Sequence, residues 1–80
     1  MAYKLEYLEA VYDMARTEGW TLLREHIERE IRVATEALVS IDMERPIQAA
    51  ALQGEIRGLR RVLAHVDFVI DQITKREDEM

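Results

Sequence analysis

The sequence predicts an all-α fold, an antiparallel two-helix hairpin with a short N-terminal helix packed on it. Apolar residues recur at steps of three and four along two long segments, at about residues 18–41 and 46–76, which is the spacing of a helical seam. Only one proline and three glycines interrupt the 80 residues, so long helices are expected. Residues 1–80 are therefore expected to form a single helical domain.

The first helix is expected over about residues 3–16. On a helical wheel, Leu8 and Val11 belong to one broad apolar arc, whereas Glu6 lies on the charged remainder of the surface. The segment TEGW that follows predicts a break and a restart, with Thr17 as the N-cap of the next helix.

Each of the two longer helices carries an apolar seam. In the second helix the seam comprises Trp20, Ile27, Ile31, Ala34, Leu38 and Ile41, with Leu23 alongside it. In the third helix it comprises Leu52, Ile56, Leu59, Leu63, Val66, Ile70 and Ile73. Pro46 suits the first turn of this third helix, because a helix leaves the first N–H groups without an internal partner.

The two seams match each other if the chain turns near residue 45, because facing residues then have numbers that add to about 90. The matched layers are Leu38–Leu52, Ala34–Ile56, Ile31–Leu59, Ile27–Leu63 and Trp20–Ile70. Arg24 interrupts the second seam. It is expected beside Asp67, where an ion pair would satisfy its charge.

A weaker stripe beside each seam predicts a groove on one face of the hairpin. It is lined by Val33, Ala37, Ser40, Ala51, Gly54, Gly58 and Val62. Each glycine inside a helix costs about 1 kcal/mol relative to alanine, but small residues let another backbone come close. The glycines are therefore expected to make room for a helix of a second copy or of another protein, so that the chain forms a homo-oligomer.

The first helix is expected to cover only one end of this groove. That end is lined by Leu22, His26, Val62, His65 and Val69. Two alternatives to a glycine interface stay open: the first helix extends over the glycines, or the glycines are simply tolerated.

Arg57, Arg60 and Arg61 cluster on the side of the third helix away from the groove. Phosphate binding in a nucleic-acid regulator is one interpretation. The net charge of −5 disfavours generic nucleic-acid binding, so a solvated face with ion pairs or contact with an acidic partner is the alternative. Phe68 projects to the same side and is expected to be a secondary interface residue.

His26 and His65 are the only histidines, and the hairpin is expected to place them side by side with Glu30 one turn beyond His26. Two imidazoles and a carboxylate could bind zinc or a similar ion, or could respond to pH. The sequence contains no HExxH or Glu-x-x-His pair, so ordinary half-buried histidines are the alternative interpretation.

Other function classes find little support in the sequence. The chain has no cysteine, a single serine, and no nucleophile or phosphate-loop motif, so neither an enzyme nor a cofactor is expected. The first ten residues mix charged and apolar side chains, which is not the pattern of a signal peptide. No apolar run has the length of a membrane span. A cytoplasmic protein is expected.

Two segments, TEGWTLLREHIEREI and LQGEIRGLRRVL, carry a resemblance over roughly residues 17–65. The matching positions are Thr17, Gly19, Trp20, Leu23, Leu52, Gly54, Leu59 and Leu63. In these positions the chain resembles small helical proteins encoded by tailed bacteriophages and prophages, often beside head and DNA-packaging genes. The resemblance implies a virus-encoded interaction protein in the host cytoplasm, and it brings no catalytic or ligand residues with it.

Overall fold

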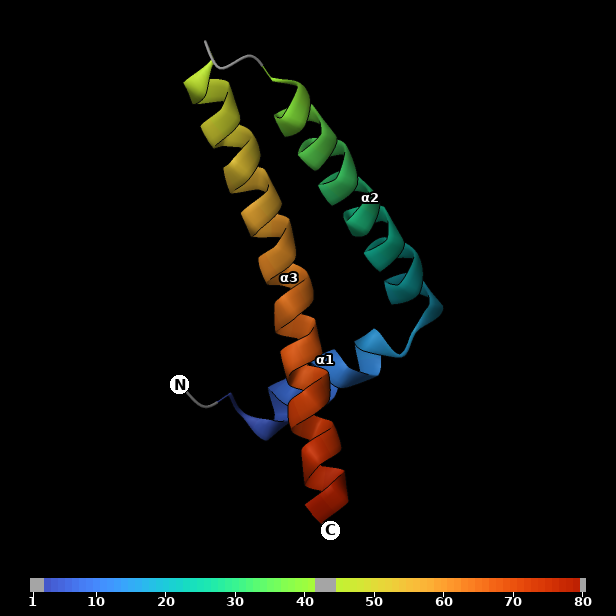
Figure 1. The fold of residues 1–80 in the computed structure, drawn as a ribbon. Coiled ribbons are helices and arrows are strands. Elements are labelled where there is room, and N and C mark those ends of the chain that lie inside the picture. The colour runs from blue at the N-terminus through green and yellow to red at the C-terminus, as the bar shows by residue number, and fades with distance from the viewer. Residues whose placement is uncertain (1–2, 42–44, 80) are drawn as a thin grey trace.

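The computed structural model describes residues 3–41 and 45–79, and in this part of the chain it contains three α-helices and no strand (Figure 1). The helices are α1 (Leu5–Ala15), α2 (Glu18–Ser40) and α3 (Pro46–Glu79). The predicted all-helical class is confirmed, and the helices pack against one another.

The helix ends differ from the prediction by a few residues. Tyr3 and Lys4 precede α1, and no side chain caps its first turn. α3 continues to Glu79, beyond the expected end at residue 76. Its last turns are rich in Lys, Arg and Glu, which are good helix formers, and the Nζ of Lys75 lies 3.2 Å from the carboxylate of Asp71 one turn earlier.

Thr17 stabilises the turn between α1 and α2, because its hydroxyl both donates and accepts a hydrogen bond. The Oγ1 donates a hydrogen bond to the Met14 carbonyl at 2.8 Å and accepts one from the Trp20 N–H at 3.1 Å. The first bond satisfies a carbonyl at the end of α1, and the second satisfies an N–H group at the start of α2. The predicted N-cap is therefore confirmed.

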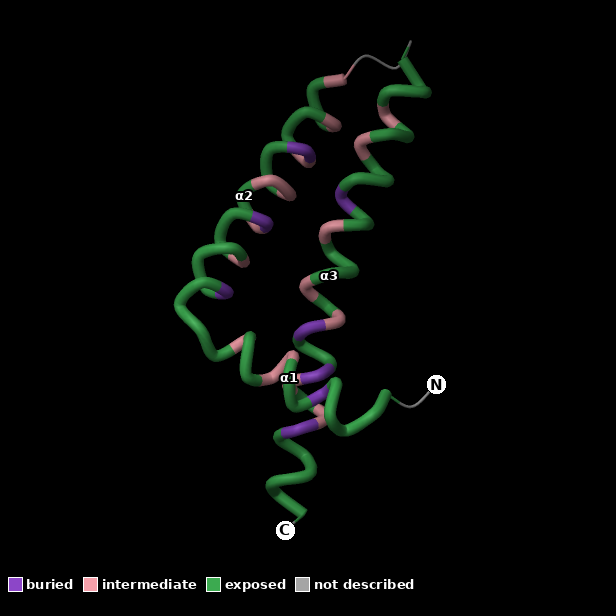
Figure 2. Tube along the Cα trace, turned by 180° about the vertical axis from the view of Figure 1, so that it is seen from behind, coloured by how far each residue is buried: buried purple, intermediate pink, exposed green. Residues whose placement is uncertain are grey.

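α2 and α3 lie side by side and run in opposite directions, and α1 crosses the C-terminal half of α3 (Figures 1 and 2). The last turns of α3 extend beyond this crossing. The radius of gyration is 16.5 Å, whereas a compact domain of this length would have about 12 Å. The described part of the chain is accordingly elongated, with extents of 56 × 29 × 18 Å.

The buried residues lie along the facing sides of α2 and α3 and where α1 crosses α3 (Figure 2). In one cluster, Leu8 of α1 packs on Val69 and Ile73 of α3. The other cluster joins α2 to α3 and comprises Trp20, Ile27 and Val66, packed with Val11, Ala15, Ile31, Leu59, Leu63 and Ile70. Trp20 is buried in the same cluster as Ile70, as the matched layers predict.

Leu23, which was expected alongside the second seam, is half exposed, because its neighbour Arg24 turns toward α3 and successive side chains on a helix point about 100° apart. One detail of the predicted packing is wrong. α1 reaches His65 and Val69 at the expected end of the groove but leaves Leu22 and Val62 exposed. Its apolar arc packs nearer the C-terminus of α3, on Val69 and Ile73.

More large apolar side chains are exposed than buried in the described part of the chain. The exposed ones are Tyr3, Leu5, Tyr7, Met14, Leu22, Leu23, Val33, Val39, Ile47, Val62 and Phe68. None of the described helices combines the length and the apolar character needed to cross a membrane.

Candidate interaction surfaces

The residues predicted to line the groove lie on an exposed face of the α2–α3 pair. This small-residue face comprises Val33, Ala37 and Ser40 of α2 and Ala51, Gly54, Gly58 and Val62 of α3, all of them exposed. A Cβ atom added at Gly54 or Gly58 would meet no other atom within 4 Å. The glycines are therefore not needed for packing within one copy, and the alternative in which the first helix covers them is wrong.

Phe68 lies apart from this face. Its ring is half exposed and contacts the edge of the Tyr3 ring, with 6.4 Å between the ring centroids. Tyr3 also stacks on Tyr7 at 5.2 Å and meets the His65 ring edge-on at 5.3 Å. The chain segment that leads into α1 thus shields part of Phe68, which the sequence reasoning missed.

Arg57, Arg60 and Arg61 line an open hollow between α2 and α3 with a volume of about 530 Å³. Its remaining lining is Thr35, Leu38, Gln53, Ile56 and Ala64. We call it the arginine hollow. Among the residues that the structure describes, none of these three arginines takes part in an ion pair, although a surface with ion pairs was the expected alternative.

Four of the six lining residues from α3 follow the helical repeat, at positions 53, 57, 60 and 64. This stripe adjoins the seam and was visible in the sequence as Gln, Arg, Arg and Ala at steps of four, three and four. Sequence reasoning placed Leu38 and Ile56 in the seam and did not show that they would also border a hollow.

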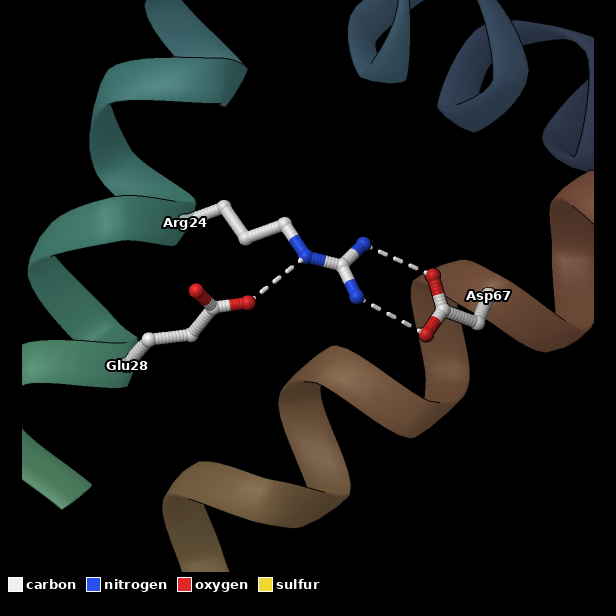
Figure 3. Close-up of polar contacts among 3 residues, drawn as sticks. All are labelled: Arg24, Glu28 and Asp67. Carbon is white, nitrogen blue, oxygen red and sulfur yellow. Dashed lines mark hydrogen bonds and ion pairs between the residues drawn. The ribbon is translucent and has the colours of Figure 1, made fainter. Parts of the chain in front are cut away.

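Arg24 bridges α2 and α3 through its contact with Asp67 (Figure 3). Its two terminal nitrogens donate to the two carboxylate oxygens of Asp67 at 2.8 and 3.1 Å, and its Nε donates to Glu28 at 3.2 Å. The expected ion pair is present. The hydrogen bonds from Arg24 lower the pKa of Asp67 below its ordinary value, and those to Asp67 and Glu28 raise the pKa of Arg24.

The two histidines have separate partners. His65 Nε2 and the Tyr7 hydroxyl of α1 are hydrogen-bonded at 2.6 Å, so His65 helps to hold α1 against α3. His26 Nε2 lies 3.9 Å from a carboxylate oxygen of Glu30. Within residues 3–41 and 45–79, no three His, Cys, Asp or Glu side chains are arranged to hold a metal ion, and this includes the predicted set of His26, His65 and Glu30.

The structure thus separates two surfaces on the α2–α3 pair, an uncharged small-residue face and a hollow edged by arginines. Comparison of the chain with protein-family models, with curated proteins and with solved structures finds no match.

Proposed function

We propose that this chain is a non-enzymatic protein–protein interaction factor that self-associates through the small-residue face. The observation that carries the proposal is the exposure of this face, with open space beside both Gly54 and Gly58. A helix that gives up about 1 kcal/mol at each glycine gains nothing from them within one copy. Close approach of a second helix would supply the compensating contacts.

The charge of the face favours a second copy as its occupant. A net charge of −5 makes two copies repel each other, so a contact between uncharged side chains, which adds no close pair of like charges, is favoured. All seven residues of the small-residue face are uncharged, so the same patch on two copies can pair around a twofold axis. The product would be a bundle of the helical hairpins predicted from the sequence.

The small core gives a second reason for self-association. Only eight apolar side chains are buried in the described residues, and Val69 alone is completely inaccessible. Burial of apolar surface contributes about 25 cal/mol per Å². A dimer that covers Val33 and Val62 would therefore add stability that a single copy of this length lacks.

The resemblance to small phage proteins favours a role in a bacterial host cell. There the oligomer would serve as an accessory of virion assembly or DNA packaging, or would bind a host protein. This part of the proposal depends on the sequence resemblance alone.

Light scattering on a dilution series tests the proposal. The native chain should have the mass of a dimer or larger oligomer at high concentration, and Gly58→Leu should shift it to a monomer. Helicity measured by circular dichroism should persist in Gly58→Leu, since an added side chain has free space in one copy. Ala50→Leu, at an exposed position of α3 outside the small-residue face, is the matched control.

A native chain that is monomeric at every concentration would refute self-association. An oligomer whose mass is the same in Gly58→Leu and in the control would instead show that the chain associates through another surface.

A further inference from the structure

The arginine hollow has a different chemistry from the small-residue face and points to another side of the α2–α3 pair. Arg60 and Gly58 are two residues apart on α3, which separates their side chains by about 200° around the helix axis. A second copy seated beside Gly58 would therefore leave Arg60 accessible. The two surfaces can be used independently.

The rim of the hollow carries three positive charges without ion-pair partners among the described residues. Arginine stays charged at any pH at which proteins are folded, and its planar guanidinium matches a carboxylate with two parallel hydrogen bonds. Arg24 shows this geometry with Asp67 on the same side of the helix pair. No carboxylate in residues 3–41 and 45–79 pairs with Arg57, Arg60 or Arg61, so within this part of the chain each can make the same contact with another molecule.

The interior of the hollow is apolar at Leu38, Ile56 and Ala64. Ile56 is buried and Leu38 is half-buried, so both are held by the packing of α2 on α3. The volume of about 530 Å³ lies within the range of about 300–1,000 Å³ that is usual for ligand pockets. The hollow can thus receive an apolar side chain while the rim receives negative charges.

We infer that the arginine hollow binds an acidic amphipathic helix of another protein. One apolar residue of that helix fills the space bordered by Leu38 and Ile56, and carboxylates one turn away pair with the rim arginines. The arginines lie at steps of three and one along α3, so acidic residues at i and i+4 of the partner helix can reach them together. Complementary charge and a central apolar anchor are the usual elements of such an interface.

An acidic helix fits this surface better than the phosphate backbone of a nucleic acid. A phosphate backbone would engage the arginines but would leave the apolar interior of the hollow unfilled. The acidic chain would also repel an extended polyanion on either side of the contact.

Fluorescence anisotropy with labelled synthetic peptides tests the inference on the full chain. The probe is a helical peptide of about 15 residues, with leucine along one face and glutamate beside it. One control peptide carries glutamine for glutamate, and another carries alanine for leucine. Only the peptide with both glutamate and leucine should bind well, and added salt should weaken that binding.

Variants of the chain locate the binding site. Arg60→Gln and Arg61→Gln should each weaken binding at least about fivefold, because each substitution removes a charge-assisted hydrogen bond to a carboxylate of the peptide. Arg29→Gln removes the same charge from an exposed position of α2 outside the hollow and should have no effect. Ala64→Phe keeps every arginine but fills the hollow, so it should abolish binding while circular dichroism shows intact helices.

Several results would overturn the inference: no binding of the acidic peptide, equal binding of the glutamine peptide, or equal effects of Arg60→Gln and Arg29→Gln. A short DNA duplex that binds more tightly than the peptide and is lost in Arg60→Gln would assign the arginines to phosphate. The same titration in Gly58→Leu separates this site from self-association, because peptide binding should persist in that variant.

Discussion

Both halves of the α2–α3 pair carry apolar seams, but these are buried to different extents. In the crossing half, where α1 packs on the pair, Trp20, Val66 and Val69 are all buried. The connector half comprises residues 33–41 and 45–58, and only Ala34 and Ile56 are buried there. Val39 and Ile47 in this half are 82% and 84% exposed.

The difference shows that a seam needs more than one partner helix to become a core. Two helices in contact cover only the sides that face each other, so Leu38 and Leu52 remain half-buried. In the crossing half, α1 supplies a third surface, and a side chain such as Val69 is enclosed completely. The connector half keeps surface available for other molecules, and both proposed interaction surfaces extend into it.

The largest expected effect comes from a pair of isoleucines in α3. Ile73 is 6% exposed and Ile47 is 84% exposed. Ile73→Ala should lower the free energy of unfolding by about 2–5 kcal/mol because it leaves a cavity beside Leu8 and Val69. Ile47→Ala should change it by less than about 0.5 kcal/mol. Urea denaturation followed by circular dichroism at low protein concentration measures both values.

If Ile73→Ala does not fold, Ile73→Val serves in its place, with an expected loss of about 0.5–1.5 kcal/mol. If Ile47→Ala lowers the free energy of unfolding as much as the Ile73 variant does, the difference in burial between the two halves is contradicted. It would mean that the connector half is covered in solution.

A smaller effect is expected from adding atoms to each half. Gly54→Ala should raise the free energy of unfolding by about 1 kcal/mol, because alanine favours a helix and its methyl group meets open space. Val69→Leu should lower it by about 1–3 kcal/mol, because Val69 has no free surface to accommodate a larger side chain. Thermal melts of dilute samples show whether each substitution raises or lowers stability. A loss of stability in Gly54→Ala would show that Gly54 is packed against other atoms in a single copy.

The smallest effect concerns the ion pair between Arg24 and Asp67, which ties α2 to α3 in the crossing half (Figure 3). The pKa of Asp67 is lowered in the folded chain. The stabilisation that the ionised Asp67 gives the folded state is therefore present above the ordinary aspartate pKa of about 3.9, and it is lost as pH falls through the lower folded pKa. The side chain of Asp67 is half exposed, so we expect the ion pair to contribute about 1 kcal/mol or less to the free energy of unfolding.

Asp67→Asn should therefore be less stable than the native chain at pH 7 and equally stable at strongly acidic pH. Urea denaturation across this pH range measures the difference. A difference that did not shrink in acid would assign the loss to packing and not to charge.

The starts of α2 and α3 and the order of the seams could be predicted because their causes are local. Thr17 caps α2 through a bond to an N–H three residues away, and Pro46 begins α3. The position of α1 could not be predicted in the same way. Leu22 with Val62 and Val69 with Ile73 were competing apolar surfaces, and only the assembled helices show which of them α1 covers.

The candidate sites also include features that could be predicted from local spacing and features that depend on tertiary packing. Sequence periodicity placed Gly54 and Gly58 on one face and Arg57, Arg60 and Arg61 on another, because side-chain direction on a helix follows from residue number. The histidines show where this reasoning ends. Residue numbers gave no sign of the hydrogen bond between His65 and Tyr7 of α1, because the position of α1 depends on tertiary packing.

The amino-acid sequence by itself determined three helices, their polar and apolar faces, and the ion pair of Arg24 with Asp67, since all of these follow from spacing along the chain. Tertiary structure decided how deeply each seam is buried, where α1 lies, and that the arginines border a hollow. These features depend on the distances and angles between helices. Such distances arise from the sum of many weak packing contacts and are not encoded by the period of any single helix.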